Sequence, residues 1–380
     1  MNITLALPLL GGLSPQQFMK RHWQKKPLLV RGAVPGFGPL LSRRELFSLA
    51  ARDDVESRLV ARQQGRWRFR RGPFGPRSLP ALSRSDWTLL VQGVDLHDQR
   101  AHDLMTQFWF LPQARLDDLM ISYATDGGGV GPHFDSYDVF LLQAQGRRRW
   151  GIGRQKDLSL RPGVPLKILA HFDAQEEYVL EPGDLLYLPP RYAHEGVALG
   201  ECQTCSIGFR APGRGELVRE LLQRLSDDAA EVAGDALYRD AAQPATDAPG
   251  QVPAALQDFA RDALRAALAD PQVLDRTLGE YLTEPKASVW FEGASDLSTP
   301  GSARVDVALD RRTRMMYDGR HVFINGESYR SAGRDRSLMR ALADRRRLVS
   351  SDLARASAGA RSLIENWREA GWLHAVETKS

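Results

Sequence analysis

The spacing of hydrophobic and polar residues changes along the chain of 380 residues, and these changes divide the chain into regions. Between residues 118 and 210, short runs of apolar, β-branched and aromatic residues recur, and Gly, Pro and Asp separate them. Runs such as LMISYA, YDVFLLQA, DLLYLPP and CQTCSIGF predict many short strands at close spacing. This spacing favours a sandwich or barrel of the jelly-roll type.

Segments in which apolar residues recur at helical spacing lie on both sides of this β-rich region. From residue 40 to about 118, helical and strand-like pieces alternate, and SRRELFSLAAR predicts a helix that Ser42 caps. From residue 215 to 282, leucines recur at helical spacing, interrupted by a loop at 241–253. These helices have too few residues to bury a broad apolar face alone. We expect them to pack on the barrel or on a second copy of the chain, and we favour a dimer contact.

The region after residue 285 combines turn signals with helical runs. Asp318-Gly319 and Asn325-Gly326 predict tight hairpin turns, because Asn and Gly tolerate positive φ. Helices beside a small hairpin indicate a winged-helix-like unit. Many such units bind DNA, but fold analogy alone does not establish that function, and the basic run at 345–347 is short. We favour a structural or protein-binding role and leave direct nucleic-acid binding open.

Composition agrees with a globular protein of two or three domains, with 43% hydrophobic and 26% charged residues. No apolar run approaches the roughly 18–20 residues of a membrane span. The first residues, MNITLALPLLGGLSPQQF, have no basic region before the short apolar run, so we read them as mature protein and expect a cytoplasmic location. The net charge of +4 favours an acidic or nucleic-acid-associated partner only weakly.

Two local patterns have more than one interpretation. In RQQGRWRFRRGPFGPR at 62–77, arginines alternate with Trp67 and Phe69. This alternation predicts a strand with an arginine face in water and an aromatic face in the core, and a surface facing nucleic acid or the ribosome is the alternative. Cys202 and Cys205 lie in a predicted strand with no second pair to complete a zinc site. We interpret both cysteines as structural.

The tripeptide His-Phe-Asp occurs twice, at 133–135 and at 171–173. His133 and Asp135 have the same parity, so in a strand both side chains point to one face. The glycine-rich stretch DGGGVGP before them lets backbone turn sharply or approach a ligand closely. The second copy lies in an acidic stretch that leads into a strand, and we assign it to a surface loop.

A third ligand for the first copy comes from GDLLYLPPRYAHEG, where His194 follows a strand and two prolines. The 61 residues from His133 to His194 leave room for several strands to return to one side of a barrel. Two histidines and one carboxylate suit iron(II) and leave positions open for substrate and oxygen. Zinc uses the same ligands, so His133, Asp135 and His194 alone do not identify the metal.

Iron(II) oxygenases with this ligand type commonly use 2-oxoglutarate, whose far carboxylate needs a cation. In GRRRWGIG, Arg148 shares the parity of the apolar Trp150 and Ile152, so it should point inward, whereas its two arginine neighbours point away. An inward cation is expensive to bury unpaired, and a dianionic cosubstrate would compensate it. Ser122 can add a hydroxyl donor. The alternative for Arg148 is a salt bridge to a nearby acid.

These residues resemble the JmjC-type 2-oxoglutarate oxygenases, and more narrowly the bacterial ribosomal oxygenases that hydroxylate arginine in a large-subunit ribosomal protein. The matching segments span about the first 210 residues: HWQKKPLLVRGA, DDLMISYATDGGGVGPHFDSYDVFLLQ, GRRRWGIG, EPGDLLYLPPRYAHEGVAL and SIGFRAP. The resemblance implies an α+β chain in three parts. They are a JmjC (cupin) domain with a double-stranded β-helix core at 1–212, a helical dimerisation region at 213–284 and a winged-helix domain at 285–380.

The resemblance also implies the site and the reaction. Iron(II) would be held by His133, Asp135 and His194, and 2-oxoglutarate by Arg148 with help from Ser122. With O2 as the third reactant, the implied activity is hydroxylation of an arginine side chain of a ribosomal protein, and the helical region implies a homodimer.

Contacts to the substrate are less defined by the sequence. We name Asp126, Asp138 and the phenol of Tyr137 as residues that can position a guanidinium. Alternatives are the same chemistry on a histidyl or lysyl substrate, and a non-catalytic metal-binding cupin whose winged helix binds nucleic acid.

Overall fold

The computed structural model describes residues 2–293 and 306–376. Within it the chain forms two compact units, Met1–Ala211 and Pro212–Ser380. Parts of the predicted C-terminal domain, 294–305 and 377–380, lie outside the described residues. No helix among the described residues is long and apolar enough to cross a membrane.

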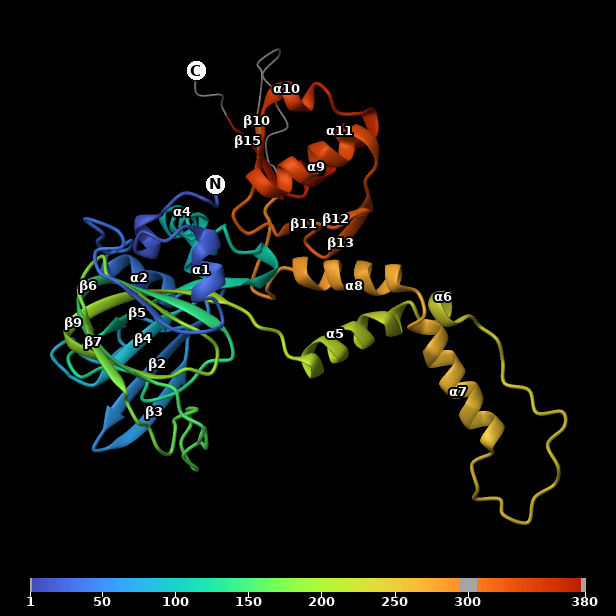
Figure 1. Ribbon diagram of the computed structural model, residues 1–380, viewed down its shortest axis with the longest axis horizontal. Coiled ribbons are helices and arrows are strands. Elements are labelled where there is room, and N and C mark those ends of the chain that lie inside the picture. Colours follow the sequence, from blue (N-terminus) through green and yellow to red (C-terminus); the bar gives the residue numbers. More distant parts are fainter. Residues whose placement is uncertain (1, 294–305, 377–380) are drawn as a thin grey trace. The chain divides into compact units, whose positions relative to one another are not determined.

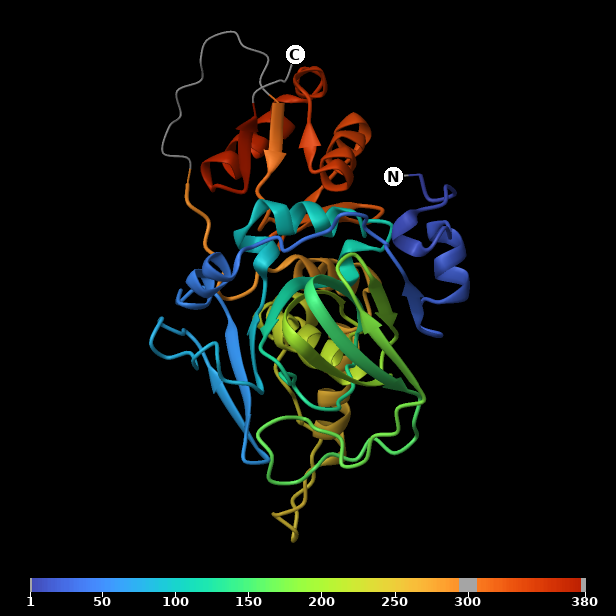
Figure 2. The same ribbon diagram turned by 90° about the vertical axis from the view of Figure 1, so that its left-hand side faces the viewer.

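Unit 1 is built on one antiparallel sheet of nine strands, ordered β1-β8-β6-β9-β5-β4-β2-β3, with β7 also paired to β6. Figure 2 shows these strands curling around an interior. Curling is possible because the long strand β6 pairs with β8 through its first half and with β7 through its second half. The strands are β1 Leu28–Val30, β2 Ser57–Gln63, β3 Arg66–Arg71, β4 Trp87–Val91, β5 Leu116–Ala124, β6 Asp138–Gly153, β7 Glu176–Leu180, β8 Leu185–Leu188 and β9 Ala193–Phe209.

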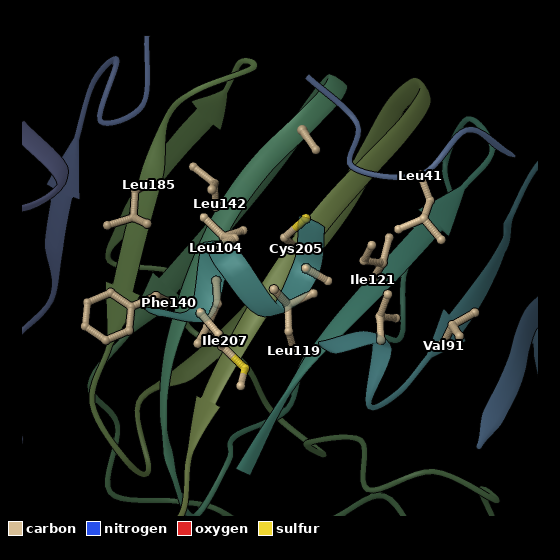
Figure 3. Packing of buried hydrophobic residues seen from close by; sticks show 14 of the residues in the cluster. Leu41, Val91, Leu104, Leu119, Ile121, Phe140, Leu142, Leu185, Cys205 and Ile207 are labelled. Atoms are coloured by element: carbon tan, nitrogen blue, oxygen red, sulfur yellow. The ribbon is translucent and has the colours of Figure 1, made fainter. Parts of the chain in front are cut away.

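Four short α-helices accompany this sheet: α1 Pro15–Arg21, α2 Arg43–Ala50, α3 Val94–His97 and α4 Gln99–Thr106. The predicted cap of α2 is confirmed, because the Ser42 hydroxyl accepts the N–H of Glu45 and the Glu45 carboxylate accepts the N–H of Ser42. One face of the sheet carries the main core, where Leu104 of α4 packs with Ile121, Leu142 and Ile207 (Figure 3). The opposite face of the sheet is therefore available for a site.

The residues of β6 that point toward the main core change between the first and the second half of the strand. Phe140 and Leu142 belong to the main core, whereas Val139 and Leu141 belong to a second cluster that also contains Trp150 and Ile152. The register of β6 against β9 shifts between Gln143 and Arg147, as at a β-bulge. Even-numbered residues therefore face the main core before the shift and the opposite side after it.

Unit 2 begins with α5 Arg214–Asp227, α6 Ala229–Ala233, α7 Ala254–Ala267 and α8 Pro271–Thr283. The helical run predicted at 253–282 is interrupted, because Asp270 caps a new helix at Gln272 and Pro271 occupies its first turn. α5 packs against α8, and α8 packs against strand β12. No residue of α7 is buried.

The rest of unit 2 holds two small sheets and three helices, shown in orange and red in Figure 1. The turn predicted at Asn325-Gly326 is confirmed, because both residues have positive φ between β12 and β13. The elements are β10 Asp306–Leu309, β11 Met315–Tyr317, β12 His321–Ile324, β13 Glu327–Arg330, α9 Gly333–Arg345, β14 Arg347–Leu348, α10 Ser350–Leu353, α11 Ala358–Glu369 and β15 Leu373–Val376.

Candidate metal and cosubstrate site

The glycine-rich loop before His133 lies against the backbone of β9. The amide N–H groups of His133 and His194 each donate to the other residue's carbonyl, at 2.9 and 2.8 Å. A Cβ added to Gly129 would come within 2.4 Å of the Gly196 carbonyl oxygen, so only glycine permits this approach. The loop thereby fixes His133 beside His194 although 61 residues separate them.

Both imidazoles are oriented by backbone carbonyls. Nδ1 of His133 lies 2.9 Å from the carbonyl oxygen of Gly131, and Nδ1 of His194 lies 2.9 Å from that of Tyr192. A carbonyl oxygen only accepts, so we assign the proton of each ring to Nδ1. Each Nε2 then keeps a free lone pair, which is the arrangement that metal-binding histidines use.

The two Nε2 atoms and the Asp135 carboxylate converge on one point. Oδ2 of Asp135 lies 3.9 Å from Nε2 of His133 and 3.6 Å from Nε2 of His194. Two atoms that each bind an ion at about 2.1 Å are at most about 4.2 Å apart, so these separations fit a shared ion. Among the described residues, His133, Asp135 and His194 form the one such group.

His194 is held in its neutral form. Burial, reinforced by the neighbouring His133, lowers the pKa of His194 to about 4. A neutral imidazole is the form that ligates a metal.

This group opens onto a cavity of about 300 Å³ on the sheet face opposite the main core. Neighbouring strands contribute alternate residues to its wall, as the pleat requires. The residues are Leu90 of β4 and Gln92 just after it, Asp118, Met120 and Ser122 of β5, Val139, Leu141, Arg148 and Trp150 of β6, and Ser206 and Gly208 of β9, with Arg58, Asp117, Val130, Tyr137 and the three ligand candidates.

Arg148 points into this cavity, as its parity predicts. It is 5% exposed, whereas Arg147 and Arg149 are exposed on the other side of the strand. Nη1 of Arg148 donates to the Ser122 hydroxyl at 3.3 Å, and the guanidinium lies 5.7 Å from the ring of Trp150. Arg148 forms no salt bridge with an acid among the described residues, so that alternative is wrong.

Three buried donors on the cavity wall lack a partner within the described residues: Nε and Nη2 of Arg148 and Nε1 of Trp150. A buried cation with unsatisfied N–H groups is costly unless an anion meets it. These donors fit a carboxylate in the cavity, and a dicarboxylate has a second carboxyl group for the metal. The chemistry of the wall therefore fits 2-oxoglutarate.

The second His-Phe-Asp copy lies in a loop between β6 and β7, and the side chains of His171 and Asp173 are exposed, as expected for a surface loop. Both cysteines are buried, as expected for a structural role. Cys202 packs with Ala124 and Ala198, whereas Cys205 belongs to the main core, so the pair does not converge on one face.

The three predicted substrate contacts have different positions. Tyr137 lines the cavity, and burial together with the neighbouring Asp135 raises its pKa well above the ordinary value. Asp126 is exposed outside the cavity, and its carboxylate accepts the N–H of Gly200, so it closes a loop. Its role in binding substrate stays a prediction, because a carboxylate that accepts one hydrogen bond can accept others.

Asp138, in contrast, is wrongly predicted as a substrate contact, because it does not line the cavity. Its side chain is fully buried on the main-core side, where it accepts hydrogen bonds from Tyr187 at 2.6 Å and from Gln24 and Arg115 at 3.1 Å. Burial raises the pKa of Asp138 although these hydrogen bonds oppose the shift. The parity of His133 and Asp135 would have excluded it, because Asp138 has the opposite parity.

Two acids of the wall were missed. Asp117 and Asp118 lie on β5 beside Gly208, whose lack of a side chain leaves room next to Asp117 and Tyr137. Parity from Ser122 finds Asp118 but not Asp117, because the register of β5 against β9 shifts between Leu116 and Leu119.

Comparison with known proteins finds similarity over both units. Residues 103–217 match the model of the JmjC domain, and residues 266–374 match the model of the ROXA-like winged helix. The Escherichia coli "Ribosomal protein uL16 3-hydroxylase" is 38% identical over 274 residues, which cover 71% of each chain.

Solved structures are similar over nearly the full length. The crystal structure of E. coli ycfD superposes with a TM-score of 0.83 at 31% identity, covering 96% of this chain and 98% of that one. A structure described as that ribosomal oxygenase in complex with cobalt and 2-oxoglutarate has a TM-score of 0.80 at 30% identity, with the same coverage of both chains.

Proposed function

This chain belongs to the ribosomal oxygenases, a family of JmjC-type 2-oxoglutarate oxygenases, and we propose that it hydroxylates an arginine side chain of the ribosomal protein uL16. As an enzyme of this family it is not a purely structural cupin. The observation that carries the proposal is the shared cavity of one metal-ligand group and one buried, incompletely bonded arginine.

In the proposed enzyme, His133, Asp135 and His194 hold iron(II), and Arg148 with Ser122 binds the far carboxylate of 2-oxoglutarate. When bound, the metal, 2-oxoglutarate and O2 supply the oxidising chemistry that inserts one oxygen atom into a C–H bond, with succinate and CO2 as co-products. The protein fixes the two imidazoles through the carbonyls of residues 131 and 192. It also holds Trp150 over Gly196 and beside His194, which keeps this part of the site dry.

The acidic end of the cavity supports an arginine substrate. Ser122 hydrogen-bonds Arg148, and Asp118 lies four residues away on the same strand face, about 13 Å along β5. Asp117 and Tyr137 lie beside Asp118. The Asp118 carboxylate accepts the N–H of Gly93 at 2.9 Å. Together with the Asp117 carboxylate, at this distance from the cosubstrate cation, it suits a substrate guanidinium that enters from the opposite end. Met120 lies between the two ends and offers an apolar surface to the aliphatic part of the side chain.

The test is oxygen transfer to a purified substrate. A uL16 peptide incubated with the protein, iron(II), ascorbate and 2-oxoglutarate should gain the mass of one oxygen atom, and fragmentation should place that atom on an arginine. Asp135→Ala should abolish the gain, and Arg147→Ala, on the solvent side of the same strand, should leave it intact. An oxygen atom found on a histidine would refute the arginine assignment and keep the enzyme class.

The acidic end has its own test. Asp118→Asn should raise the KM for the peptide more than it lowers kcat, because the guanidinium loses one ionic partner but the metal ligands remain. A peptide with lysine in place of the target arginine should be a poor substrate, since an ammonium cannot bridge two carboxylates in the same plane. Equal rates for both peptides would contradict a guanidinium site.

We further propose that α7 mediates a homodimer. Leu256, Leu264 and Leu268 project from one side of α7 and the residue after it, and they are 38%, 63% and 44% exposed. Such a stripe is typical of a helix that packs on a partner. Leu264→Asp should convert the dimer to a monomer in sedimentation velocity, whereas Arg265→Asp, one position along the helix, should not.

The proposed substrate also indicates the cellular location of the enzyme. Ribosomal proteins are made and assembled in the bacterial cytoplasm, so we place the enzyme there. Fractionation of cells with an antibody against the chain checks this placement.

A further inference from the structure

The segment from Ser57 to Ser85 is strongly and uniformly basic. It contains eight arginines, no lysine and no aspartate or glutamate, whereas the whole chain has a net charge of only +4. Six of the arginines lie on the hairpin that β2 and β3 form, which Figure 1 shows at the lower edge of unit 1. We name this hairpin, residues 57–71, the arginine hairpin.

The arginines of β3 are free to meet a ligand. β3 is the edge strand of the sheet, and Arg66, Arg68, Arg70 and Arg71 are all exposed. Arg66, Arg68 and Arg71 form no hydrogen bond or ion pair through their side chains within residues 2–293 and 306–376. This surface therefore has an excess of positive charge that the described protein does not neutralise.

Aromatic rings interleave with these cations. Trp67 and Phe69 lie on the opposite face of β3 from Arg66 and Arg68, and both rings are only partly buried. The Arg62 guanidinium stacks over Trp67 at 5.8 Å. The sequence expectation of an aromatic face in the core is thus met only in part.

The arginine hairpin is continuous with the cavity. Arg58 lines the cavity, and its cross-strand partner on β3 is Arg71. Trp67 also lies against the loop that leads to His133, because a Cβ added to Gly131 would come within 2.9 Å of the Trp67 ring. Arg58 lies level with Leu90 and Ser122 across the sheet, so a ligand bound along the hairpin lies beside the part of the cavity that holds Arg148.

We propose that the arginine hairpin binds single-stranded RNA. Arginine favours phosphate because its planar guanidinium donates two parallel hydrogen bonds and keeps its charge. Rows of arginine beside partly exposed aromatic rings are typical of surfaces that bind RNA backbone and stack bases. An acidic protein is a less suitable partner, because the segment uses arginine alone and presents rings among the cations.

This inference rests on the proposed function for its biological meaning. A hydroxylase of a ribosomal protein that also binds RNA can meet its substrate beside ribosomal RNA. The binding itself does not depend on that function and is measured separately.

The experiment is fluorescence anisotropy of a labelled oligouridylate with the full chain, at several KCl concentrations. The variant is Arg66→Gln with Arg68→Gln, both on the exposed edge strand. For single strands, each phosphate contact contributes about 0.7 to the slope of log K against log salt. Loss of two contacts should lower that slope by about 1.4 and weaken binding by about 25-fold at about 0.1 M salt.

The matched control is Arg21→Gln with Arg44→Gln, which removes the same charge from two exposed arginines elsewhere in unit 1. The control should change the affinity for RNA by less than about twofold, and both variants should melt like the wild type. Equal weakening in control and variant would show that only net charge matters and would overturn the site. Displacement of the RNA by polyglutamate at equal charge concentration would overturn the choice of RNA as partner.

The two proposals fail in different ways. Hydroxylation of the isolated uL16 peptide should be unchanged in the Arg66, Arg68 variant, because neither side chain lines the cavity. If wild-type protein binds oligouridylate through these arginines but transfers oxygen to no uL16 arginine, the hairpin assignment stands and the proposed function falls. If the peptide is hydroxylated but the variant binds RNA like the wild type, the reverse holds.

Discussion

Replacement of Arg148 by methionine tests the cosubstrate site most directly. Methionine has a similar length and no charge, so it fills the space without a donor. In the wild type, Nη1 of Arg148 is bonded to Ser122, and Nε and Nη2 have no partner among the described residues. The variant should lose affinity for 2-oxoglutarate and keep affinity for the metal.

The magnitude follows from the two unsatisfied N–H groups. A hydrogen bond to a charged group contributes about 1.5–3 kcal/mol, so two of them contribute about 3–6 kcal/mol. Each 1.4 kcal/mol is about tenfold in a dissociation constant, so the Kd for 2-oxoglutarate should rise by about 10² to 10⁴. Without 2-oxoglutarate, the variant should unfold at a higher temperature than the wild type, because it no longer buries an incompletely paired cation.

The assay is anaerobic titration calorimetry of 2-oxoglutarate into manganese-loaded protein, together with thermal unfolding with and without 2-oxoglutarate. Saturating 2-oxoglutarate should stabilise the wild type and reverse the order of the two melting temperatures. Arg147→Met is the control, since Arg147 neighbours Arg148 on the exposed face of β6. The reasoning is refuted if the Kd for 2-oxoglutarate changes less than threefold, or if the metal is lost instead.

Three further changes have definite expected outcomes. Asp135→Ala removes the anionic ligand candidate and should weaken manganese binding, measured by electron paramagnetic resonance, by more than about 100-fold. Asp310→Asn should destabilise unit 2 by about 3 kcal/mol in urea titration at neutral pH, because Asp310 is 8% exposed and bonded to Arg312 and His374. Burial would raise the pKa of Asp310, but these hydrogen bonds outweigh it and lower the pKa. The wild type should therefore lose its advantage over Asp310→Asn as the pH falls below about 4, the usual pKa of an unfolded carboxyl group. Burial raises the pKa of the Cys205 thiol to about 12, so a thiol reagent should label it only after unfolding, and rapid labelling of folded protein would contradict the structure.

The sequence predicted which side chains meet at the site better than it predicted their local structure, because residues 134–137 form no strand and His133 forms only an isolated bridge with His194. His133, Asp135 and Tyr137 share odd parity, and all three line the cavity. The same rule excludes Asp138, which has even parity and is buried among main-core residues. The error there came from choosing residues by charge and neglecting their parity.

Other features depend on contacts that no local pattern contains. The break between α7 and α8 was visible in Asp270-Pro271, but the bare surface of α7 appears only when neighbouring elements are placed. Likewise, the pairing of the His133 and His194 backbones joins segments far apart in sequence. The motif suggested that the two histidines meet, and the glycine contact at 129 gives the reason.

The correct inward placement of Arg148 depended on which residues served as its reference. Trp150 and Ile152 lie on the same side of the β6 irregularity as Arg148, so parity between them is reliable. A count of alternating residues from His133 would have predicted that Arg148 points away from the metal. That prediction would be wrong because the residues on the cavity side change from odd-numbered to even-numbered between Gln143 and Arg147. Gly146 accommodates the irregularity, because its φ is +63° and a Cβ added to it would lie 2.1 Å from the Glu201 carbonyl oxygen. The alternation of residues thus predicts which face of the sheet a side chain points to only within a regular ladder. A glycine in the middle of a long strand marks a place where this alternation can shift.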